Sequence, residues 1–547
     1  MRQWKLLVAG SLIVFNLPAQ QRINRLPGVI NHPSINVSAP YVSLDGSSLL
    51  FLSDNTEDNI LGVFYSTKAD GITWKEPTPL PRNINTRQNF LRGYALSADG
   101  KQLFISSAKG GGVGGYDIYA SDLKGFWQEP LNLGVPVNSP AHEACPSLTA
   151  DGLTMYFMRC TKMAATVAEG CKLMVTRRRT LTDRWGAPEE LPATINTGNA
   201  QAPRIMGDSE TLIFSSNTLT PNRGGMDLYL TRLVNNSWSA PVPLDFANSD
   251  KDDQWVSGTS LGRYLMKDAQ GRSATEIVEV LFPPEVKPKG VMKLEGKVTG
   301  PPNPGAAYVS VWDKASQTRL SNVRPAADGA FTLFLKEGTD YVVSVDPEQD
   351  NLTFASKEFL LADGKFNTTE RVQFALKPLT PGVILDLTNT TFKPYTAELT
   401  TSSEAELRKL VRLIKANAAF NFSVEVALFG YVEDTVQRDA DLTEVITDTL
   451  HIPVTRHYTD TIFTEPAGSL SADSLAVPAY TLTQRAETVD SVVVKHRYHN
   501  DRTAYMALEI VNYLVAQGVP ANKLTPLHLA QPAIPNERKW RISITAR

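Results

Sequence analysis

Residues 96–133 read LSADGKQLFISSAKGGGVGGYDIYASDLKGFWQEPLNL. Two alternating apolar runs flank Asp99-Gly100, and because Gly accepts the positive φ of a tight turn, this half predicts a β-hairpin. A glycine-rich loop, a third apolar run and the motif Trp127-x-x-Pro130 follow. The segment therefore predicts about four short antiparallel strands joined in chain order.

The same pattern recurs at intervals of about 53 residues. Related hairpins surround Asp45, Asp151 and Asp208, with a degenerate copy around Ser260. The Trp-x-x-Pro motif begins at Trp74, Trp127, Trp185 and Trp238. Self-similarity at this period, with four strands a unit, predicts the blades of a β-propeller. Asp45, Asp99 and Asp151 are then turn residues rather than catalytic ones.

The two ends of the repeat region complement each other. The last unit, from about Asp253 to Phe282, lacks a Trp-x-x-Pro segment. The N-terminal LPGVINHPSINVSAPYVSLDG, from Leu26, matches LGVPVNSPAHEACPSLTADG, from Leu133. We therefore expect a five-bladed β-propeller over 21–285, whose last blade is completed by the N-terminal segment.

These repeats resemble the TolB-type or WD-like propeller repeats of bacterial exported proteins. The resemblance covers roughly residues 22–285 and implies a fold, not a ligand.

The first residues have the layout of a secretory signal. A cationic MRQWK precedes an apolar stretch from Leu6 to Leu17, and Pro18-Ala19-Gln20 follows. The apolar stretch is too short to cross a bilayer, so we expect 1–20 to be a cleaved signal peptide rather than a buried first helix. No later run reaches about 18 apolar residues, so we expect no transmembrane segment in the mature chain. The expected location is the periplasm, in association with the outer membrane or cell wall.

Charge and cysteine usage restrict the partners. The net charge of −3 and the absence of a long basic stripe make nucleic acid an unlikely ligand class. The three cysteines are Cys145, Cys160 and Cys171. In an oxidising compartment two of them can pair, and Cys160 with Cys171 is the preferred pair because they flank one hairpin loop. Three buried, reduced cysteines are the alternative. No metal site and no cofactor are expected.

A proline-rich PPEVKPKG ends the repeat region and supplies a linker at 286–290. Short alternating runs over 291–378, among them YVSVWD and DGAFTLFLKEG, predict a β-sandwich of about seven strands. Their order resembles the carboxypeptidase regulatory-like domain, a transthyretin-like sandwich that serves as a spacer or adhesive module.

The period changes again at 379–547. A helix over 402–417 carries apolar residues at Leu407, Leu410, Val411 and Ile414, the spacing of a helix packed on a sheet. The strand FSVEVALFGY, a second helix over 504–517 and the final strand WRISI follow, so we expect an α+β unit. These segments resemble the OmpA-like peptidoglycan-associated domain.

That resemblance implies a site for the peptide stem of peptidoglycan. The corresponding positions here are Gly430, Glu433 and Asp434, while the arginine of the family's second helix falls on Met506. Methionine cannot pair with a carboxylate, so we expect Arg502, one turn earlier, or Lys495 to be the substitute. Either peptidoglycan binding is retained through these residues, or the domain is a structural or protein-binding platform.

An insertion at 438–497 interrupts the OmpA-like region and predicts extra hairpins or an extended arm. Every Asp-Ser/Thr-aliphatic triplet of the chain lies in or just before it, with acceptor hydroxyls at Thr435, Thr449, Thr461, Ser474 and Ser491. These triplets resemble the acceptor of general O-glycosylation in Bacteroidota. A threonine-rich β arm is the alternative.

The order propeller, regulatory-like sandwich, OmpA-like domain resembles envelope proteins of Bacteroidota, and distantly the PorE-type component of type 9 secretion. We expect a non-enzymatic scaffold or anchoring protein, with peptidoglycan and envelope proteins as partners. An accessory role in a secretion machinery is one alternative. A propeller hydrolase is another, with Glu143, Asp252 and Asp253 as its carboxylates, but no nucleophile or metal motif accompanies them.

Overall fold

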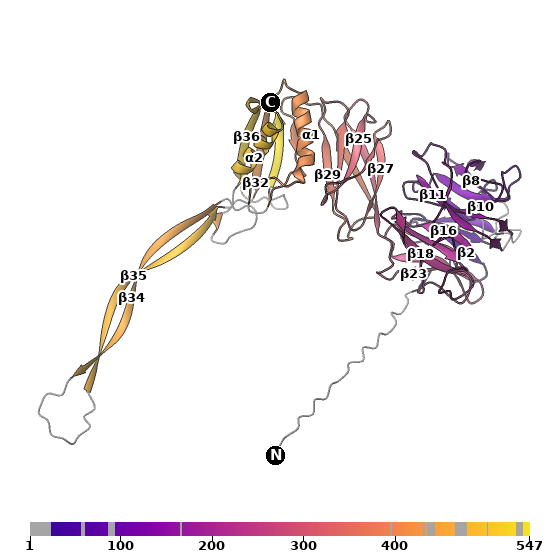
Figure 1. Cartoon of the computed structure of the whole chain (residues 1–547), viewed down its shortest axis with the longest axis horizontal. Helices are drawn as coiled ribbons and strands as arrows, with labels where there is room; N and C mark the ends of the chain where they lie inside the picture. The colour runs from indigo at the N-terminus through magenta and orange to yellow at the C-terminus, as the bar shows by residue number, and fades with distance from the viewer. Residues whose placement is uncertain are drawn as a thin grey trace, which may run out of the picture. The chain divides into compact units, whose positions relative to one another are not determined.

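The computed structural model is mainly β and divides into two compact units (Figure 1). It describes residues 23–55, 61–85, 93–164, 167–393, 396–429, 433–434, 444–464, 479–499, 502–531 and 540–547. The expected signal peptide, 1–20, lies outside these ranges. The first unit is Met1–Gly296 with Thr332–Thr339 and Leu360–Val372, and the second is the remainder of the chain.

Five small antiparallel sheets follow one another in the first unit, and four of them are built in chain order. Their strands are β2 (Val37–Val42), β3 (Ser48–Ser53), β4 (Gly62–Thr67) and β5 (Thr78–Pro79); β6 (Tyr94–Leu96), β7 (Gln102–Ser107), β8 (Asp117–Asp122) and β9 (Leu131–Asn132); β10 (His142–Leu148), β11 (Thr154–Cys160), β14 (Lys172–Arg177) and β15 (Glu189–Glu190); and β16 (Ala200–Ile205), β17 (Thr211–Ser216) and β18 (Asp227–Val234), with β19 (Ser237–Trp238) and β20 (Val242–Pro243) both on β18. A small hairpin, β12 (Lys162–Met163) and β13 (Ala168–Glu169), lies between β11 and β14.

The aspartates of the repeat are turn residues. Asp45 Oδ1 accepts hydrogen bonds from the Ser43 hydroxyl (2.6 Å) and from the amide and hydroxyl of Ser47 (3.0 and 2.8 Å). The next residue, Gly46, has φ +73°, which the turn requires and which glycine adopts without steric cost. Asp99 and Asp151 accept equivalent bonds, so these carboxylates hold the hairpins together.

The fifth sheet joins the two ends of the repeat region. Its order is β1 (Ile23–Arg25), β23 (Thr275–Leu281), β22 (Tyr264–Gln270) and β21 (Val256–Gly258). Ile23 pairs with Val280, and the side chain of Asn31 both donates to and accepts from the backbone of Ile277 (2.8 Å each). The N-terminal strand therefore completes the sheet that the last repeat begins.

Hydrogen bonds link each of these sheets to the next and the fifth sheet back to the first. The five links run from Tyr94 Oη to the Ala39 carbonyl, the Glu143 amide to the Tyr116 carbonyl, the Ile205 amide to Ser147 Oγ, Arg204 Nε to the Val256 carbonyl, and the Val42 amide to Ser257 Oγ. The first strands of the sheets thus surround a common centre.

Residues 291–378 form seven strands in two sheets, with the orders β27-β24-β30 and β26-β25-β28-β29. The strands are β24 (Val291–Thr299), β25 (Ala307–Asp313), β26 (Arg319–Val323), β27 (Ala330–Lys336), β28 (Tyr341–Pro347), β29 (Ala355–Phe359) and β30 (Thr369–Ala375). The alternation of the sequence is visible in β27, where Phe331, Leu333 and Leu335 are buried between more exposed residues.

The C-terminal part is an α+β arrangement in which two helices accompany one sheet of order β31-β37-β32-β36. Its elements are β31 (Ile384–Asp386), α1 (Ser403–Ala416), β32 (Phe422–Phe429), α2 (Thr503–Ala516), the 3-10 turn Ala521–Lys523, β36 (Leu524–Gln531) and β37 (Trp540–Ala546). Leu407, Leu410 and Ile414 of α1 are buried in the same core as Val424 and Ile544 of the sheet. Neither described helix is long and apolar enough to span a bilayer.

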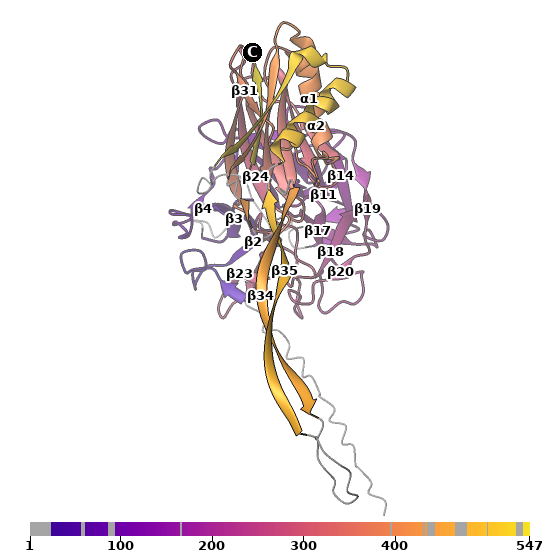
Figure 2. The ribbon, with the colours of Figure 1, turned by 90° about the vertical axis from the view of Figure 1, so that its left-hand side faces the viewer.

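The insertion forms an arm. After the short β33 (Glu433–Asp434), the strands β34 (Glu444–Thr464) and β35 (Ala479–His499) pair antiparallel over their whole length, from Glu444–His499 to Thr464–Ala479. Figure 2 shows the two strands twisting around each other. The described side chains of this arm are mostly exposed, so the predicted extended arm is a two-stranded ribbon with both faces open to solvent.

Candidate functional site

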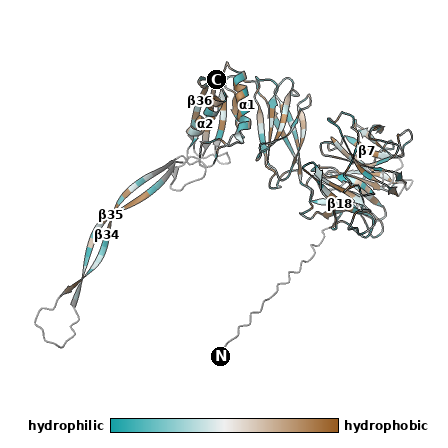
Figure 3. Cartoon of the chain, viewed as in Figure 1, coloured by the Kyte–Doolittle hydropathy of each residue, from teal (hydrophilic) through white to brown (hydrophobic). Residues whose placement is uncertain are grey.

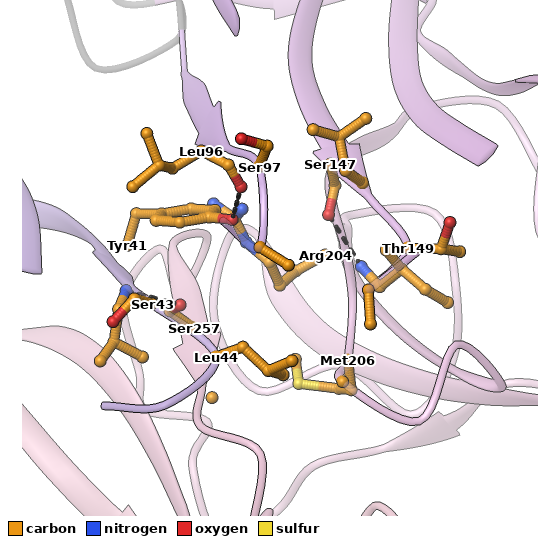
Figure 4. A pocket seen from close by; sticks show the side chains of 17 residues that line it. Tyr41, Ser43, Leu44, Leu96, Ser97, Ser147, Thr149, Arg204, Met206 and Ser257 are labelled. Atoms are coloured by element: carbon orange, nitrogen blue, oxygen red, sulfur yellow. Dashed lines mark hydrogen bonds between the residues drawn. The ribbon is translucent and has the colours of Figure 1, made fainter. Parts of the chain in front are cut away.

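A pocket lies at the centre of the five sheets of the first unit. Five segments line it, one from each sheet: 41–44, 96–98, 147–150, 204–207 and 257–258. Its volume is about 50 Å³, which is room for a few water molecules or one small polar group. Figure 4 shows these side chains from close by.

A repeated bulge points side chains into this pocket. The first strands of three sheets lose register at Ser38/Tyr41, Ala144/Ser147 and Gln201/Arg204. In each bulge one non-glycine residue has positive φ: Ala39 (49°), Cys145 (55°) and Ala202 (46°). A bulge re-aims the side chains that follow it. The residues two positions later, Tyr41, Ser147 and Arg204, all line the pocket.

Arg204 is the charged residue among the lining side chains, and it is only 8% exposed. Its Nε donates to the Val256 carbonyl (3.0 Å), and its guanidinium lies 4.6 Å from the centre of the Tyr41 ring. Figure 4 shows the guanidinium against that ring. Within the described residues, the buried Nη1 has no hydrogen-bond partner.

The surroundings do not neutralise this cation. Burial lowers the pKa of Arg204, and the titratable groups that act on it are Tyr41, Tyr94 and Cys145. Burial raises the pKa of all three, so they are uncharged near neutral pH. The pocket therefore holds a positive charge beside phenols and a thiol, with no carboxylate among its described lining residues.

Two serines from other sheets also line the pocket. Ser147 Oγ accepts a hydrogen bond from the Ile205 amide, and Ser257 Oγ accepts one from the Val42 amide (3.0 Å each). A hydroxyl that accepts a backbone bond still has its own proton to donate. The site thus combines a guanidinium nitrogen with two hydroxyl donors, a set that suits an anionic oxygen ligand.

Sequence reasoning missed this pocket. The signal that could have found it is a small residue followed by proline at the same place in three repeats: Ala39-Pro40, Cys145-Pro146 and Ala202-Pro203. The residue after each proline is the one that enters the pocket.

The carboxylates considered for a hydrolase are engaged in internal contacts. Glu143 is fully buried, pairs with Arg159 Nε (2.6 Å) and accepts the Ser139 amide (2.9 Å). Asp253 is 4% exposed, pairs with Lys267 and accepts the Ser249 amide (2.6 Å). Asp252 accepts the Met226 amide (2.8 Å). Within the described residues, no group of three or more His, Cys, Asp or Glu side chains could hold a metal ion.

The residues expected to contact peptidoglycan are only partly described. Gly430 lies outside the described residues, and Glu433 and Asp434 form β33, whose side chains are not described. Arg502 is half-buried and immediately precedes α2. Met506 is 4% exposed and belongs to the hydrophobic core, so the position that carries the family's arginine packs inward here.

The remaining predicted sites lie on the first unit and on the arm. A disulfide joins Cys160 to Cys171, the preferred pair, while Cys145 is buried beside the central pocket. Of the expected glycosylation acceptors, Thr449 and Thr461 are exposed on β34 and Ser491 is half-buried on β35. Thr435 and Ser474 lie outside the described residues.

No protein-family model and no curated protein matches this chain. Solved structures that resemble it include a putative TolB from Agrobacterium tumefaciens (16% identity, 48% of this chain and 87% of that one, TM-score 0.31). An endo-arabinase from Bacteroides thetaiotaomicron (18%, 47% and 97%, TM-score 0.34) and an oligogalacturonate lyase from Vibrio parahaemolyticus (14%, 58% and 82%, TM-score 0.27) are others.

Proposed function

We propose that this chain is a non-enzymatic scaffold or anchoring protein of the periplasm, associated with the outer membrane or cell wall. Residues 21–285 form a five-bladed β-propeller that binds a protein or glycan partner, and residues 379–547 form an OmpA-like domain that contacts peptidoglycan. The transthyretin-like sandwich lies between them in the sequence as a spacer.

The observation that carries this proposal is the composition of the central pocket. Arg204 supplies a fixed positive charge, and the other lining residues are hydroxyl-bearing or apolar. Hydrolysis needs a nucleophile or a general acid and base at the reacting bond. The buried carboxylates Glu143 and Asp253 are bound in ion pairs elsewhere in the unit. The arrangement therefore favours binding over catalysis.

The circuit of hydrogen bonds supports a closed ring of five blades. Each sheet is hydrogen-bonded to the next, and the Val42 amide links the first sheet to the fifth. The pairing of β1 with β23 adds a second tie between the two ends of the repeat region.

The sheet β31-β37-β32-β36 with α1 and α2 supports the OmpA-like assignment of 379–547. Because Met506 is buried, peptidoglycan contact would depend on Arg502 and on the carboxylates of β33. Opposite charges of this kind can hold the ionised groups of a peptide stem. The arm begins beside these carboxylates, since both β33 and β34 pair with β35.

Retention of the full chain on purified sacculi tests the anchoring role. We expect the protein to sediment with sacculi at low salt, and the double variant Glu433→Ala, Asp434→Ala to lose at least half of that retention, because the two carboxylates would face the cationic group of the stem. Asp460→Ala, on the exposed part of the arm, is the matched control and should be retained like the unmodified protein. Absence of retention at low salt would contradict peptidoglycan anchoring.

Glycosylation of Thr449, Thr461 and Ser491 stays a prediction. The exposure of the two threonines supports it, and the intact mass of the protein from its native host would decide it.

A further inference from the structure

Arg204 is a buried cation without an anion among the residues that the structure describes. Its side chain is more than nine-tenths buried, its Nη1 has no hydrogen-bond partner among the described residues, and its titratable neighbours are neutral. Taking an ion out of water costs a large free energy unless a counter-charge and hydrogen bonds replace the lost solvation. The contact with Tyr41 and the bond to Val256 offset part of this cost, and a ligand that carries a negative charge would offset more.

We propose that the central pocket binds one carboxylate group, with the guanidinium of Arg204 and the hydroxyls of Ser147 and Ser257 as donors. This inference names the ligand chemistry of the propeller and so rests on the proposed binding function. The donors come from three different sheets, on β10, β16 and β21. A ligand held by all three would therefore also tie those sheets together.

Size and donor number favour a carboxylate over a larger oxyanion. The cavity of about 50 Å³ admits a group of a few heavy atoms. Two carboxylate oxygens offer about four acceptor positions, which is enough for the three donors of the site. Arg204 Nε already donates to the Val256 carbonyl, so the guanidinium would donate to the ligand through its terminal Nη nitrogens.

Calorimetric titration of the full chain with sodium acetate, at constant ionic strength in sodium chloride, tests the site. We expect saturable millimolar binding of acetate and none of acetamide, its uncharged analogue. Arg204→Met should weaken acetate binding at least tenfold. Without acetate, the same variant should unfold at an unchanged or higher denaturant concentration, because it removes an uncompensated buried charge.

Arg178 supplies the matched control. Its guanidinium also stacks on an aromatic ring, that of Trp185 at 4.4 Å, but its Nε and Nη1 both donate to backbone carbonyls (2.9 Å each). Arg178→Met should lower stability and leave acetate binding unchanged. If Arg204→Met does not fold, the pair Ser147→Ala, Ser257→Ala should still weaken acetate binding several-fold.

The proposal would be overturned if acetate binding does not saturate up to 100 mM, or if Arg204→Met binds acetate as tightly as the unmodified protein does. D-glucuronate and triglycine, each compared with its amide, then distinguish a sugar acid from a peptide end as the source of the carboxylate. Sacculus retention is a separate readout on the other unit, so failure of acetate binding is distinguishable from failure of the anchoring role.

A different observation concerns one face of the arm. Three successive cross-strand pairs on this face are Leu450–Val493, Ile452–Ser491 and Val454–Val489. The three residues of β34 are 40–42% exposed, and Figure 3 shows hydrophobic and hydrophilic stretches in turn along the arm. A two-stranded ribbon is at best marginally stable in water by itself. An apolar patch at its middle would therefore be stabilised by another surface that packs on it.

The charges at the two ends of this aliphatic patch are self-complementary. Asp448 pairs across the ribbon with Lys495 at one end, and Arg456 pairs with Glu487 at the other. A two-fold rotation about the middle of the patch, with the axis across the strands, places Asp448 over Arg456 of the second copy and Lys495 over Glu487. A two-fold axis along the strands places Asp448 over Lys495 and Arg456 over Glu487. Unlike charges meet in both arrangements.

We infer that, in a chain without a glycan on Ser491, this face of the arm binds the same face of a second copy of the chain. Stacking two ribbons buries the five aliphatic side chains between them, as in a β-sandwich. The four charged residues would then form ion pairs at the rim, where they select the register more than they add affinity.

Sedimentation velocity of the full chain between 1 and 100 μM tests this inference. We expect a reversible dimer, and Ile452→Asp should raise its dissociation constant at least tenfold because it places a charge at the centre of the patch. Val492→Asp, on the opposite face of the same arm and 54% exposed, should dimerise normally. A monomer at 100 μM, or equal disruption by both variants, would overturn the inference.

Discussion

Replacing Lys267 by methionine is expected to lower the free energy of unfolding of the first unit by about 3–5 kcal/mol, because it leaves a buried carboxylate without its counter-ion. Lys267 and Asp253 are 6% and 4% exposed and form an ion pair. Lys267 Nζ also donates to the Ala247 carbonyl (2.6 Å), and Asp253 accepts the amide and hydroxyl of Ser249 (2.6 and 2.9 Å). Equilibrium denaturation in urea measures the change.

Two controls separate the lost charge from lost packing. The double variant Lys267→Met, Asp253→Asn should recover part of the loss, since it removes the orphaned charge and keeps a hydrogen-bonding side chain. Lys124→Met breaks an exposed pair with Asp122 (4.0 Å) and should change stability by less than about 1 kcal/mol. If Lys267→Met and Lys124→Met have equal effects, the buried pair does not carry the stability assigned to it.

Removing the disulfide should cost about 3 kcal/mol, the loop-closure value for a short loop. Cys160 and Cys171 are 11 positions apart, at the end of β11 and just before β14, and both are buried. Without the bond, the unfolded chain regains the freedom of the intervening loop. Urea denaturation with and without a reductant measures this difference on one and the same sequence.

The variant Cys160→Ser, Cys171→Ser is the control for the reductant. It should be less stable than the oxidised protein and should not respond to reduction. An unchanged midpoint for the reduced native sequence would show that the bond contributes nothing to stability.

The repeat made it possible to predict the strands and turns of the first unit from the sequence. Asp45-Gly46 and its relatives specify tight turns through local chemistry, and the match between the segments that begin at Leu26 and Leu133 predicted the role of the N-terminal strand. These features depend on neighbours in the chain or on a comparison of repeats, which the sequence contains.

The candidate site could not be predicted from the sequence in the same way. The pair Ala202-Pro203 marks the position of Arg204 in the repeat, but its importance follows from burial and from the absence of a carboxylate beside it among the described residues, which are properties of three-dimensional packing. Glu143 and Asp253 illustrate the reverse case. Each looks like a candidate for chemistry in the sequence, but Arg159 and Lys267, 16 and 14 positions further along the chain, bind them in the fold.

The C-terminal part was predicted less completely than the sheets of the first unit and more completely than the pocket. The spacing of Leu407, Leu410 and Ile414 predicted α1, because a helix that packs on a sheet must repeat its apolar residues. The sequence also indicated an arm in the insertion. It could not give the pairing of β34 with β35, since either strand alternates well enough to accept a shifted partner.

The pairing of β1 with β23 also sets an order of events during synthesis of the chain. Asn31 and its partner Ile277 are 246 positions apart, so the fifth sheet cannot form until almost the whole first unit has emerged. Contacts so distant along the chain make folding slow and leave strand edges open in the meantime. A chain that crosses a membrane with its N-terminus first would hold β1 unpaired for longest, and a chaperone that shields strand edges would act in that interval.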